Sequence, residues 1–270
     1  MRYAPYIPKK TLGQHFLHDA NIARNIVAAL DPLPGDVVLE IGSGTGVLTA
    51  LLAERGCRLI AMDIDARAVE VLQERFPEER YPHVRVMQQD VLSLDLKAMA
   101  EEYGAPLRLI GNLPYNITSQ ILFHIFDRHD AVRDGIFMMQ REVAERIIAA
   151  PGCKEYGILS VLTQTHASVR RCFNVSPNVF TPRPNVWSSV LYLRMENDRL
   201  AQIRNYSFFR RLVKATFGQR RKTLSNSLKQ LGIMPGDATN AAAFLSLRPE
   251  QLTITDFSTL SNLINAYDRT

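Results

Sequence analysis

Residues 37–46 read Val37-Val38-Leu39-Glu40-Ile41-Gly42-Ser43-Gly44-Thr45-Gly46, and this stretch decides the fold of the 270-residue chain. Its apolar first half predicts a buried strand, and apolar residues at helical spacing in 47–52 predict a helix directly after the glycines. Glycines in such a turn permit unusual backbone angles and let a ligand come close to the main chain. Their spacing, G-x-G-x-G, differs from the G-x-G-x-x-G of nicotinamide-binding domains and disfavours a nicotinamide oxidoreductase.

Carboxylates follow the next two predicted strands. The strand 58–62 ends at Asp63, about twenty residues after the glycines, where a carboxylate can accept hydrogen bonds from a ribose diol. The strand 84–88 is followed by Asp90. Either residue alone is more often a helix cap. Because the carboxyl ends of parallel strands meet at one edge of a sheet, the two together favour a ligand site there.

The tetrapeptide Asn112-Leu113-Pro114-Tyr115 follows the apolar segment 107–111, which predicts another buried strand. It suits the exocyclic amino group of adenine, a poor nucleophile because its lone pair is delocalised into the ring. The Asn carbonyl and a backbone carbonyl beside the proline can accept hydrogen bonds from that group and localise its lone pair. The Tyr ring offers the base a face to stack on. The alternative is an ordinary turn at the end of a strand.

Predicted strands and helices alternate along the first two-thirds of the chain. This alternation is typical of an α/β fold, with a parallel sheet covered by helices on both faces. The segments 161–175 and 188–194 predict antiparallel strands added at the end. A short charged linker near 195–199 then separates a domain of residues 1–197 from an all-helical domain of residues 198–270. The expected strands are 37–41, 58–62, 84–89, 107–111 and 135–139, and the expected helices are 19–30, 47–55, 65–76, 117–127 and 141–149.

Four segments in this order resemble the ribosomal RNA adenine N6,N6-dimethyltransferases, and most closely the small-subunit enzymes that dimethylate two adjacent adenosines. The segments are Gly13-Gln14-His15-Phe16-Leu17, Glu40–Gly46, Asn112–Tyr115 and Phe180-Thr181-Pro182-Arg183-Pro184-Asn185-Val186. The resemblance runs from about residue 9 to the end. It implies a Rossmann-like, S-adenosylmethionine-dependent methyltransferase sheet with a small C-terminal helical domain. One departure is His15, where the family usually has Asn, and this puts its cofactor contact in doubt.

The resemblance also implies roles for individual residues. The target adenine would lie between Tyr115 and Phe180, with its N6 held by Asn112 and by the carbonyl of Leu113 or Pro114. From spacing alone, Phe180 is equally well a core anchor of a loop that two prolines stiffen. S-adenosylmethionine would be bound by Gln14, His15, Leu17, Gly42, Gly44, Gly46, Asp63, Asp90 and Asn112.

Positive charge is concentrated in the last quarter of the chain. Residues 201–270 hold ten Lys/Arg and four Asp/Glu, a balance of +6, whereas residues 1–200 have a balance of −1. From Arg199 to Gly236 there are basic residues and no acidic ones. This distribution favours phosphate binding over a merely solvated basic surface. The candidate RNA-binding residues are Arg210, Arg211, Lys214, Arg220, Arg221 and Lys222.

Several classes of protein are disfavoured by composition. No apolar stretch approaches the ~20 residues that span a bilayer, and the N-terminus lacks the apolar core of a signal peptide. The three cysteines, Cys57, Cys153 and Cys172, are widely spaced and odd in number, which predicts neither a metal site nor a disulfide framework. We expect a cytoplasmic, monomeric protein that binds ribosomal RNA within a small subunit or its precursor. We do not expect it to bind a membrane.

Two rival functions remain beside small-subunit methylation. The large-subunit adenine methylase that confers macrolide resistance shares every quoted motif, but the long basic helical domain and Leu113 favour the small-subunit enzyme. A non-catalytic ribosome-assembly factor would retain the fold without the chemistry. The intact Asn112, Pro114, Tyr115 and glycine turn argue against that second alternative.

Overall fold

The computed structural model describes residues 14–229, 232 and 241–265. The expected N-terminal arm, Met1–Leu12, lies outside the described residues, as do Gly13 and several residues of the expected helical domain. The described chain divides into two compact units. The first contains the residues up to Ala144 together with Val169–Met195, and the second contains Glu145–Ser168 together with the residues from Glu196 onward.

Within the described residues of the first unit, seven strands form one sheet in the order β4-β3-β2-β5-β6-β9-β7. The strands from β4 to β6 run parallel, and β9 pairs with β6 in the antiparallel sense. The direction in which strands are added to the sheet reverses at β2. β3 and β4 lie on one side of β2, and β5 and the later strands lie on the other. The bounds are β2 Val37–Ile41, β3 Arg58–Asp63, β4 Val84–Gln88, β5 Leu107–Asn112, β6 Val132–Gln140, β7 Ala167–Val175 and β9 Ser188–Met195.

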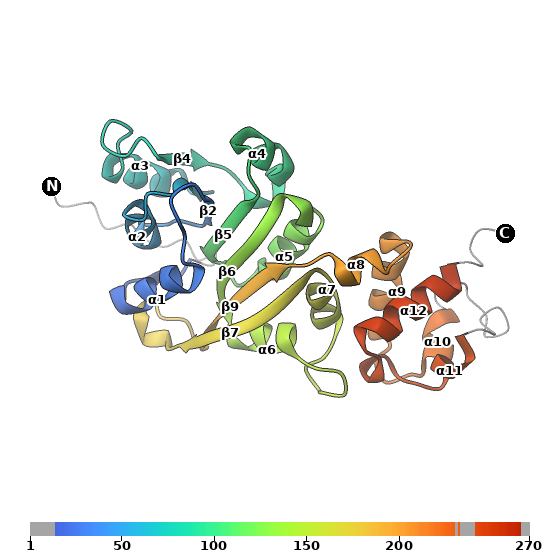
Figure 1. The fold of residues 1–270 in the computed structure, drawn as a ribbon. Helices are drawn as coiled ribbons and strands as arrows, with labels where there is room; N and C mark the ends of the chain where they lie inside the picture. The colour runs from blue at the N-terminus through green and yellow to red at the C-terminus, as the bar shows by residue number, and fades with distance from the viewer. Residues whose placement is uncertain (1–13, 230–231, 233–240, 266–270) are drawn as a thin grey trace. The chain divides into compact units, whose positions relative to one another are not determined.

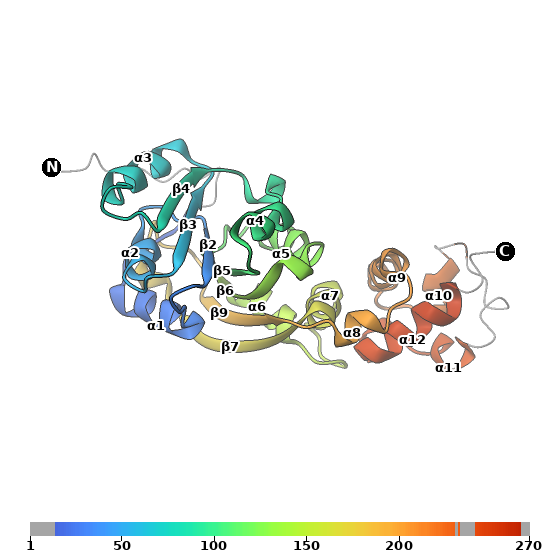
Figure 2. The ribbon, with the colours of Figure 1, turned by 45° about the horizontal axis from the view of Figure 1, so that its top comes forward.

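Helices cover both faces of this sheet (Figures 1 and 2). One face carries α1 (Ala20–Leu30), α2 (Val47–Ala53) and α3 (Ala66–Arg75), and the other carries α4 (Leu96–Tyr103) and α5 (Thr118–Phe126). The helix α6 (Arg141–Ile148) follows β6 directly. Side chains of Asp19 and Asp65 accept backbone N–H groups at the starts of α1 and α3, which fixes where these helices begin.

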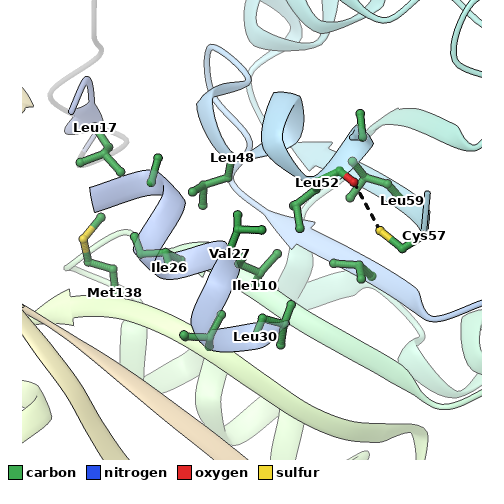
Figure 3. Packing of buried hydrophobic residues seen from close by; sticks show 14 of the residues in the cluster. Leu17, Ile26, Val27, Leu30, Leu48, Leu52, Cys57, Leu59, Ile110 and Met138 are labelled. Atoms are coloured by element: carbon green, nitrogen blue, oxygen red, sulfur yellow. Dashed lines mark hydrogen bonds between the residues drawn. The ribbon is translucent and has the colours of Figure 1, made fainter. Parts of the chain in front are cut away.

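The core beneath α1 and α2 follows from the alternation of side chains along the strands. Residues paired across neighbouring strands point to the same face, so Val38, Leu59, Ile110 and Ile136 all meet these helices. Figure 3 shows Ile26, Val27 and Leu30 of α1 beside Leu48, Ile110 and Met138. Cys57 is buried in the same cluster, and its thiol donates to the Leu52 carbonyl.

The expected strand 161–175 is wrong in its first six residues and confirmed from Ala167 to Val175. Residues 158–166 form the helix α7 (Ile158–His166), and only Ala167–Val175 is extended. Val161 and Thr165 of α7 are buried, and a short buried apolar run does not distinguish a strand from a helix by periodicity. Thr165 donates its hydroxyl to the Val161 carbonyl one turn earlier, which satisfies that polar group within the helix. The helix α4 was also not expected.

The second unit contains α7 and the helices from α8 onward. Its core is built from apolar side chains of α9 and α12, with Phe209, Leu212, Phe257 and Leu260 fully buried. Tyr156 is buried with them and donates its hydroxyl to the Leu252 carbonyl. The helices are α8 Asp198–Ala201, α9 Tyr206–Gly218, α10 Leu224–Leu228, α11 Ala242–Leu245 and α12 Ile254–Asn265. None of the helices in the described part of the chain has the length and apolar character to cross a membrane.

One boundary between the units falls after Met195, inside the expected linker. The division of the sequence into 1–197 and 198–270 nevertheless differs from the compact units, because residues 145–168 group with the C-terminal helices. Backbone and side-chain contacts explain this grouping. Gly152 N donates to the Glu250 carbonyl, and Arg199 donates to the Gln164 carbonyl.

Candidate active site

The glycine turn after β2 brings the backbone against a carboxylate. Gly42, Gly44 and Gly46 all have positive φ values, of 73°, 54° and 80°. Gly44 N donates to Asp63 Oδ2 at 2.9 Å. A Cβ at Gly44 would lie 2.9 Å from the ring of Phe16, so a side chain there would displace that ring as well as strain the backbone.

Asp63 ends β3 and is buried, with 6% of its surface exposed. Its second oxygen, Oδ1, accepts from Asp65 N at 2.9 Å. Burial raises the pKa of Asp63, and the hydrogen bonds from the Asp65 and Gly44 backbones oppose that rise. Each carboxylate oxygen accepts one backbone hydrogen bond and has a further lone pair.

Glu40 lies beneath the glycine turn. It is 1% exposed, and its Oε2 accepts from Thr49 Oγ1 of α2 at 2.6 Å. Burial raises the pKa of Glu40 to about 8, although the hydrogen bond from Thr49 opposes this. The pair therefore joins β2 to α2 directly behind the turn, with the carboxyl inclined to hold its proton near neutral pH.

Asn112, at the end of β5, makes a hydrogen bond through only one of the two polar atoms of its side-chain amide. Its Nδ2 donates to the backbone oxygen of His15 at 2.8 Å. Its Oδ1 is buried and has no hydrogen-bond partner. A buried acceptor without a donor is costly, and Asn112 is among the residues that line the pocket described below, where a ligand N–H group can supply the missing donor.

Tyr115 is fixed at both ends of its ring. The ring stacks on that of His15, with centroids 5.3 Å apart and an interplanar angle of 27°. Its hydroxyl lies 2.7 Å from Ser188 Oγ. The His15 Nδ1 lies 2.7 Å from the Pro182 carbonyl, so His15 joins the Tyr115 segment to the loop that follows Phe180.

These side chains surround one pocket at the carboxyl edge of the sheet. Of the residues expected at the site, the pocket is lined by Gln14, His15, Gly42, Asp63, Asp90, Asn112, Leu113, Pro114 and Tyr115. Leu17 and Gly44 line an adjoining hollow, together with Gly42 and Asn112. Gly46 begins α2, where a Cβ would lie 2.9 Å from the side chain of Leu72.

Phe180 lies in the hydrophobic core, with 3% of its surface exposed. It belongs to the short strand β8 (Phe180–Thr181), which pairs with β1 (Phe16–Leu17) and places Phe180 opposite Leu17. The ring that faces Tyr115 in this structure is that of His15. Phe180 packs as an anchor of the loop in this structure, and the base-stacking role that the resemblance implies stays a prediction.

Several lining residues were not expected from the sequence. Met62, Ile64, Gln89 and Val91 line the pocket beside the two strand-end carboxylates. They could have been predicted from the sequence, because each lies within one residue of Asp63 or Asp90. Ser188 has no such signal, because its contact with Tyr115 joins residues 73 positions apart.

The basic candidates lie in the second unit, and they differ in their surroundings. Arg211 and Lys214 on α9 are exposed, as are Arg221 and Lys222 after it, and Arg210 is partly buried. Arg220 instead donates to the carbonyls of Cys153 and Lys154 and lies 3.9 Å from the Glu250 carboxylate. Arg220 therefore holds the loop before α7 within this unit.

Known proteins share both the sequence and the fold. The model of the ribosomal RNA adenine dimethylase family matches residues 8–265. A ribosomal RNA small subunit methyltransferase A from Salinibacter ruber is 46% identical over 268 residues, covering 97% of this chain and 87% of the relative. Its counterpart from Syntrophus aciditrophicus is 40% identical over 266 residues, covering 96% and 94%.

Solved structures confirm the expected fold class. A dimethyladenosine transferase from Plasmodium falciparum matches with a TM-score of 0.81 at 24% identity, covering 94% of this chain and 98% of that chain. The 23S rRNA methyltransferase ErmE matches with a TM-score of 0.67 at 23% identity, covering 93% and 99%. Because both identities are below 25%, these two matches show a shared fold only.

Proposed function

Because the chain belongs to the ribosomal RNA adenine dimethylase family, we propose that the pocket around Asn112 transfers methyl groups to the N6 atoms of adenines in small-subunit ribosomal RNA. The enzyme uses S-adenosylmethionine as its methyl donor. Relatives at 46% and 40% identity carry the small-subunit name, which favours that subunit over the large-subunit, macrolide-resistance activity. The unpartnered acceptor of Asn112 favours an enzyme over a non-catalytic assembly factor.

The residues of the pocket fit S-adenosylmethionine. Each oxygen of Asp63 can accept one further hydrogen bond, which suits the two hydroxyls of a ribose. Ile64 is half exposed at the pocket and offers an apolar surface to an adenine ring, and Asp90 at the next strand end offers an acceptor to its amino group. The backbone at Gly42 leaves room for the methionine part, since it carries no side chain and a Cβ there would have only the Asn112 backbone oxygen within 4 Å.

The observation that carries the proposal is the buried Oδ1 of Asn112. Its Nδ2 is already fixed on the His15 backbone, so the amide cannot turn without losing that hydrogen bond. An adenine N6 amino group, which carries two N–H donors, supplies the missing partner. A hydrogen bond accepted from N6 draws the lone pair out of the ring and toward the methyl group.

The second acceptor for N6 is assigned to the carbonyl of Leu113. The Pro114 carbonyl already accepts from Ile117 N at 3.2 Å and from Thr118 Oγ1 at 2.9 Å. Both of its lone pairs are therefore in use. Leu113 N is fixed on the Met138 carbonyl at 3.0 Å, which holds the Leu113 peptide at the end of β5.

The reaction then needs little from the protein beyond position and exclusion of water. When bound, S-adenosylmethionine supplies an electrophilic methyl group. N6 would receive this methyl group through its lone pair as the carbon–sulfur bond breaks, and it would release one proton to water. Asn112 and Leu113 hold N6, and Tyr115 offers its ring to the base. After one transfer N6 still has one N–H, which Asn112 can accept before the second transfer.

The proposal extends to the substrate and its setting. The exposed Arg211, Lys214, Arg221 and Lys222 would bind RNA phosphates, and the residues from 198 onward would act as the RNA-binding domain. Roles for Gln14, His15 and Leu17 at the cofactor are part of the same proposal. We propose that the enzyme works as a monomer in the cytoplasm, on the RNA of a small subunit or its precursor.

The test compares two asparagines in the same segment. In Asn112→Ala the acceptor for N6 is lost, and single-turnover transfer of radiolabelled methyl groups to unmethylated small-subunit RNA should slow by about 10²–10³-fold. Asn116→Ala, at an exposed position four residues later, should transfer at the wild-type rate. RNA affinity should stay the same in both variants. Wild-type transfer by Asn112→Ala would contradict the proposal.

A further inference from the structure

Two neighbouring apolar side chains are exposed near the pocket. Among the described residues, the exposed large apolar side chains are Leu33, Ile64, Val186 and Trp187. Leu33 precedes β2 at the amino edge of the sheet, and Ile64 lines the cofactor pocket. Val186 and Trp187 directly precede β9, at the carboxyl edge. The pocket does not account for the exposure of Trp187, of which 49% is open to solvent.

The backbone of Trp187 is fixed beside the contact that orients Tyr115. The Trp187 carbonyl accepts from Arg141 N at 2.9 Å, at the junction of β6 and α6. The next residue, Ser188, pairs with Gln140 and places its hydroxyl 2.7 Å from that of Tyr115. Trp187 is thus the residue next to Ser188, whose hydroxyl contacts that of Tyr115, and its own backbone is fixed on Arg141.

The charge of this segment favours a polyanion as its partner. Between Ala167 and Met195 the sequence has four arginines and no acidic residue. Arg183, four residues before Trp187, is exposed. An exposed aromatic ring with an exposed arginine in the same loop suits single-stranded nucleic acid, which such sites bind by stacking on a base and by contact with phosphate.

We propose that Trp187 stacks on the unpaired RNA base next to the adenine that enters the pocket. This inference rests on the proposed function, because it requires that an adenine be held at Tyr115. A base drawn out of a stack leaves its neighbour without a partner on one side, and an aromatic ring beside the pocket replaces that partner. Trp187 is then a positioning residue for RNA. It takes no part in the transfer step.

The first test uses the fact that Trp187 is the sole tryptophan of the chain. Its fluorescence therefore reports on this ring alone. A short single-stranded RNA with two adjacent adenines is added to the full-length protein, and its binding is followed separately by the anisotropy of a dye on the RNA. We expect the emission of Trp187 to be quenched in parallel with binding. Unchanged emission while the anisotropy shows bound RNA would overturn the inference.

The second test uses variants and the unmethylated small-subunit particle. In Trp187→Leu the apparent KM for the particle should rise by about 5-fold or more, the usual effect of losing one stacked base, with kcat nearly unchanged. Trp187→Phe retains a ring and should recover most of the affinity. Val186→Ala, in the same loop, should leave KM as it is. An unchanged KM in Trp187→Leu would contradict the proposal and would assign the ring to another partner.

The two proposals can fail separately. Cofactor affinity, measured by calorimetry, should be the same in Trp187→Leu and in the wild type, which shows that the fold of the pocket is intact. If the wild type methylates N6 while the emission and KM tests fail, the inference about Trp187 is wrong and the proposed function stands. If the wild type transfers no methyl group to N6, the proposed function fails at that step.

Discussion

The hydroxyls of Tyr115 and Ser188 lie 2.7 Å apart, and Ser188 is completely buried. The tilt of the Tyr115 ring is therefore fixed by a hydrogen bond with Ser188 of β9 as well as by the stack on His15. Tyr115→Phe keeps the ring but leaves the Ser188 hydroxyl without this partner. Such a loss costs about 1–3 kcal/mol of stability, so we expect a lower melting temperature with most of the methyl transfer retained.

The double variant separates the two roles of Tyr115. Replacing both partners, in Tyr115→Phe with Ser188→Ala, removes the unsatisfied hydroxyl and should recover part of the lost stability. Tyr115→Ala should slow transfer much more than Tyr115→Phe, since the stacking surface itself is gone. Thermal unfolding and single-turnover rates measure these effects. Equal transfer rates for the Ala and Phe variants would show that stacking by the Tyr115 ring does not contribute to methyl transfer.

A second prediction concerns Asp63, whose two oxygens hold the turn at Gly44 and the start of α3. Asp63→Asn keeps the shape but places an N–H₂ group against a backbone donor or a ribose hydroxyl. We expect S-adenosylmethionine to bind at least about 10-fold more weakly, the usual cost of losing hydrogen bonds to a charged group. Asp95→Asn, at the N-cap of α4, is the control. Calorimetry that finds wild-type affinity in Asp63→Asn would exclude Asp63 from the cofactor site.

The parts of the site that the sequence predicted are those fixed by strand ends. The glycine turn, Asp63, Asp90 and the Asn112 tetrapeptide each follow a buried apolar run, and parallel strands bring such ends to one edge. Their meeting in one pocket thus follows from local patterns and the rule for parallel sheets. The stack of His15 on Tyr115 could not be predicted in this way, because it depends on how the first described residues lie across the sheet.

Local sequence patterns left two features of the structure unpredicted. Residues 161–166 are predicted as part of a strand because β-branched side chains favour strands, but tertiary burial of those side chains stabilises a helix there. Arg220 was grouped with its basic neighbours, yet it donates to two carbonyls of a loop about 66 residues earlier in the chain. A charge pattern cannot show which arginine is used within the fold.

That difference gives a third prediction, about RNA binding by the second unit. Arg221 and Lys222 are exposed, so replacing both with Gln removes charge without disturbing the core. If both contact phosphates, RNA affinity falls and the slope of log K against log salt becomes shallower by about 2. Arg220→Gln should instead lower the melting temperature, because the loop at Cys153 and Lys154 loses its donor. An unchanged salt slope in the double variant would assign Arg221 and Lys222 to a solvated surface.

The fourth prediction follows from the buried Glu40. Burial raises its pKa in the folded protein from 4.5 to about 8, so between these values the folded state binds more protons at Glu40 than the unfolded state does. The stability associated with the protonated carboxyl is fully present below the unfolded pKa and is lost as pH rises through the folded one. The melting temperature of the wild type should therefore fall between about pH 5 and about pH 9.

Glu40→Gln isolates this contribution, because its amide oxygen can still accept from Thr49 Oγ1 and it does not titrate. Asp63 also has a raised pKa, but it is present in both proteins and cancels when they are compared. Over that pH range we expect the melting temperature of the variant to rise by several degrees relative to that of the wild type. A difference of about 1 kcal/mol in stability corresponds to about 2–4 °C. Unfolding curves at a series of pH values measure the difference. If the melting temperatures of the two proteins changed in parallel with pH, Glu40 would be ionised in the folded protein. The protonated carboxyl behind the glycine turn would then be excluded.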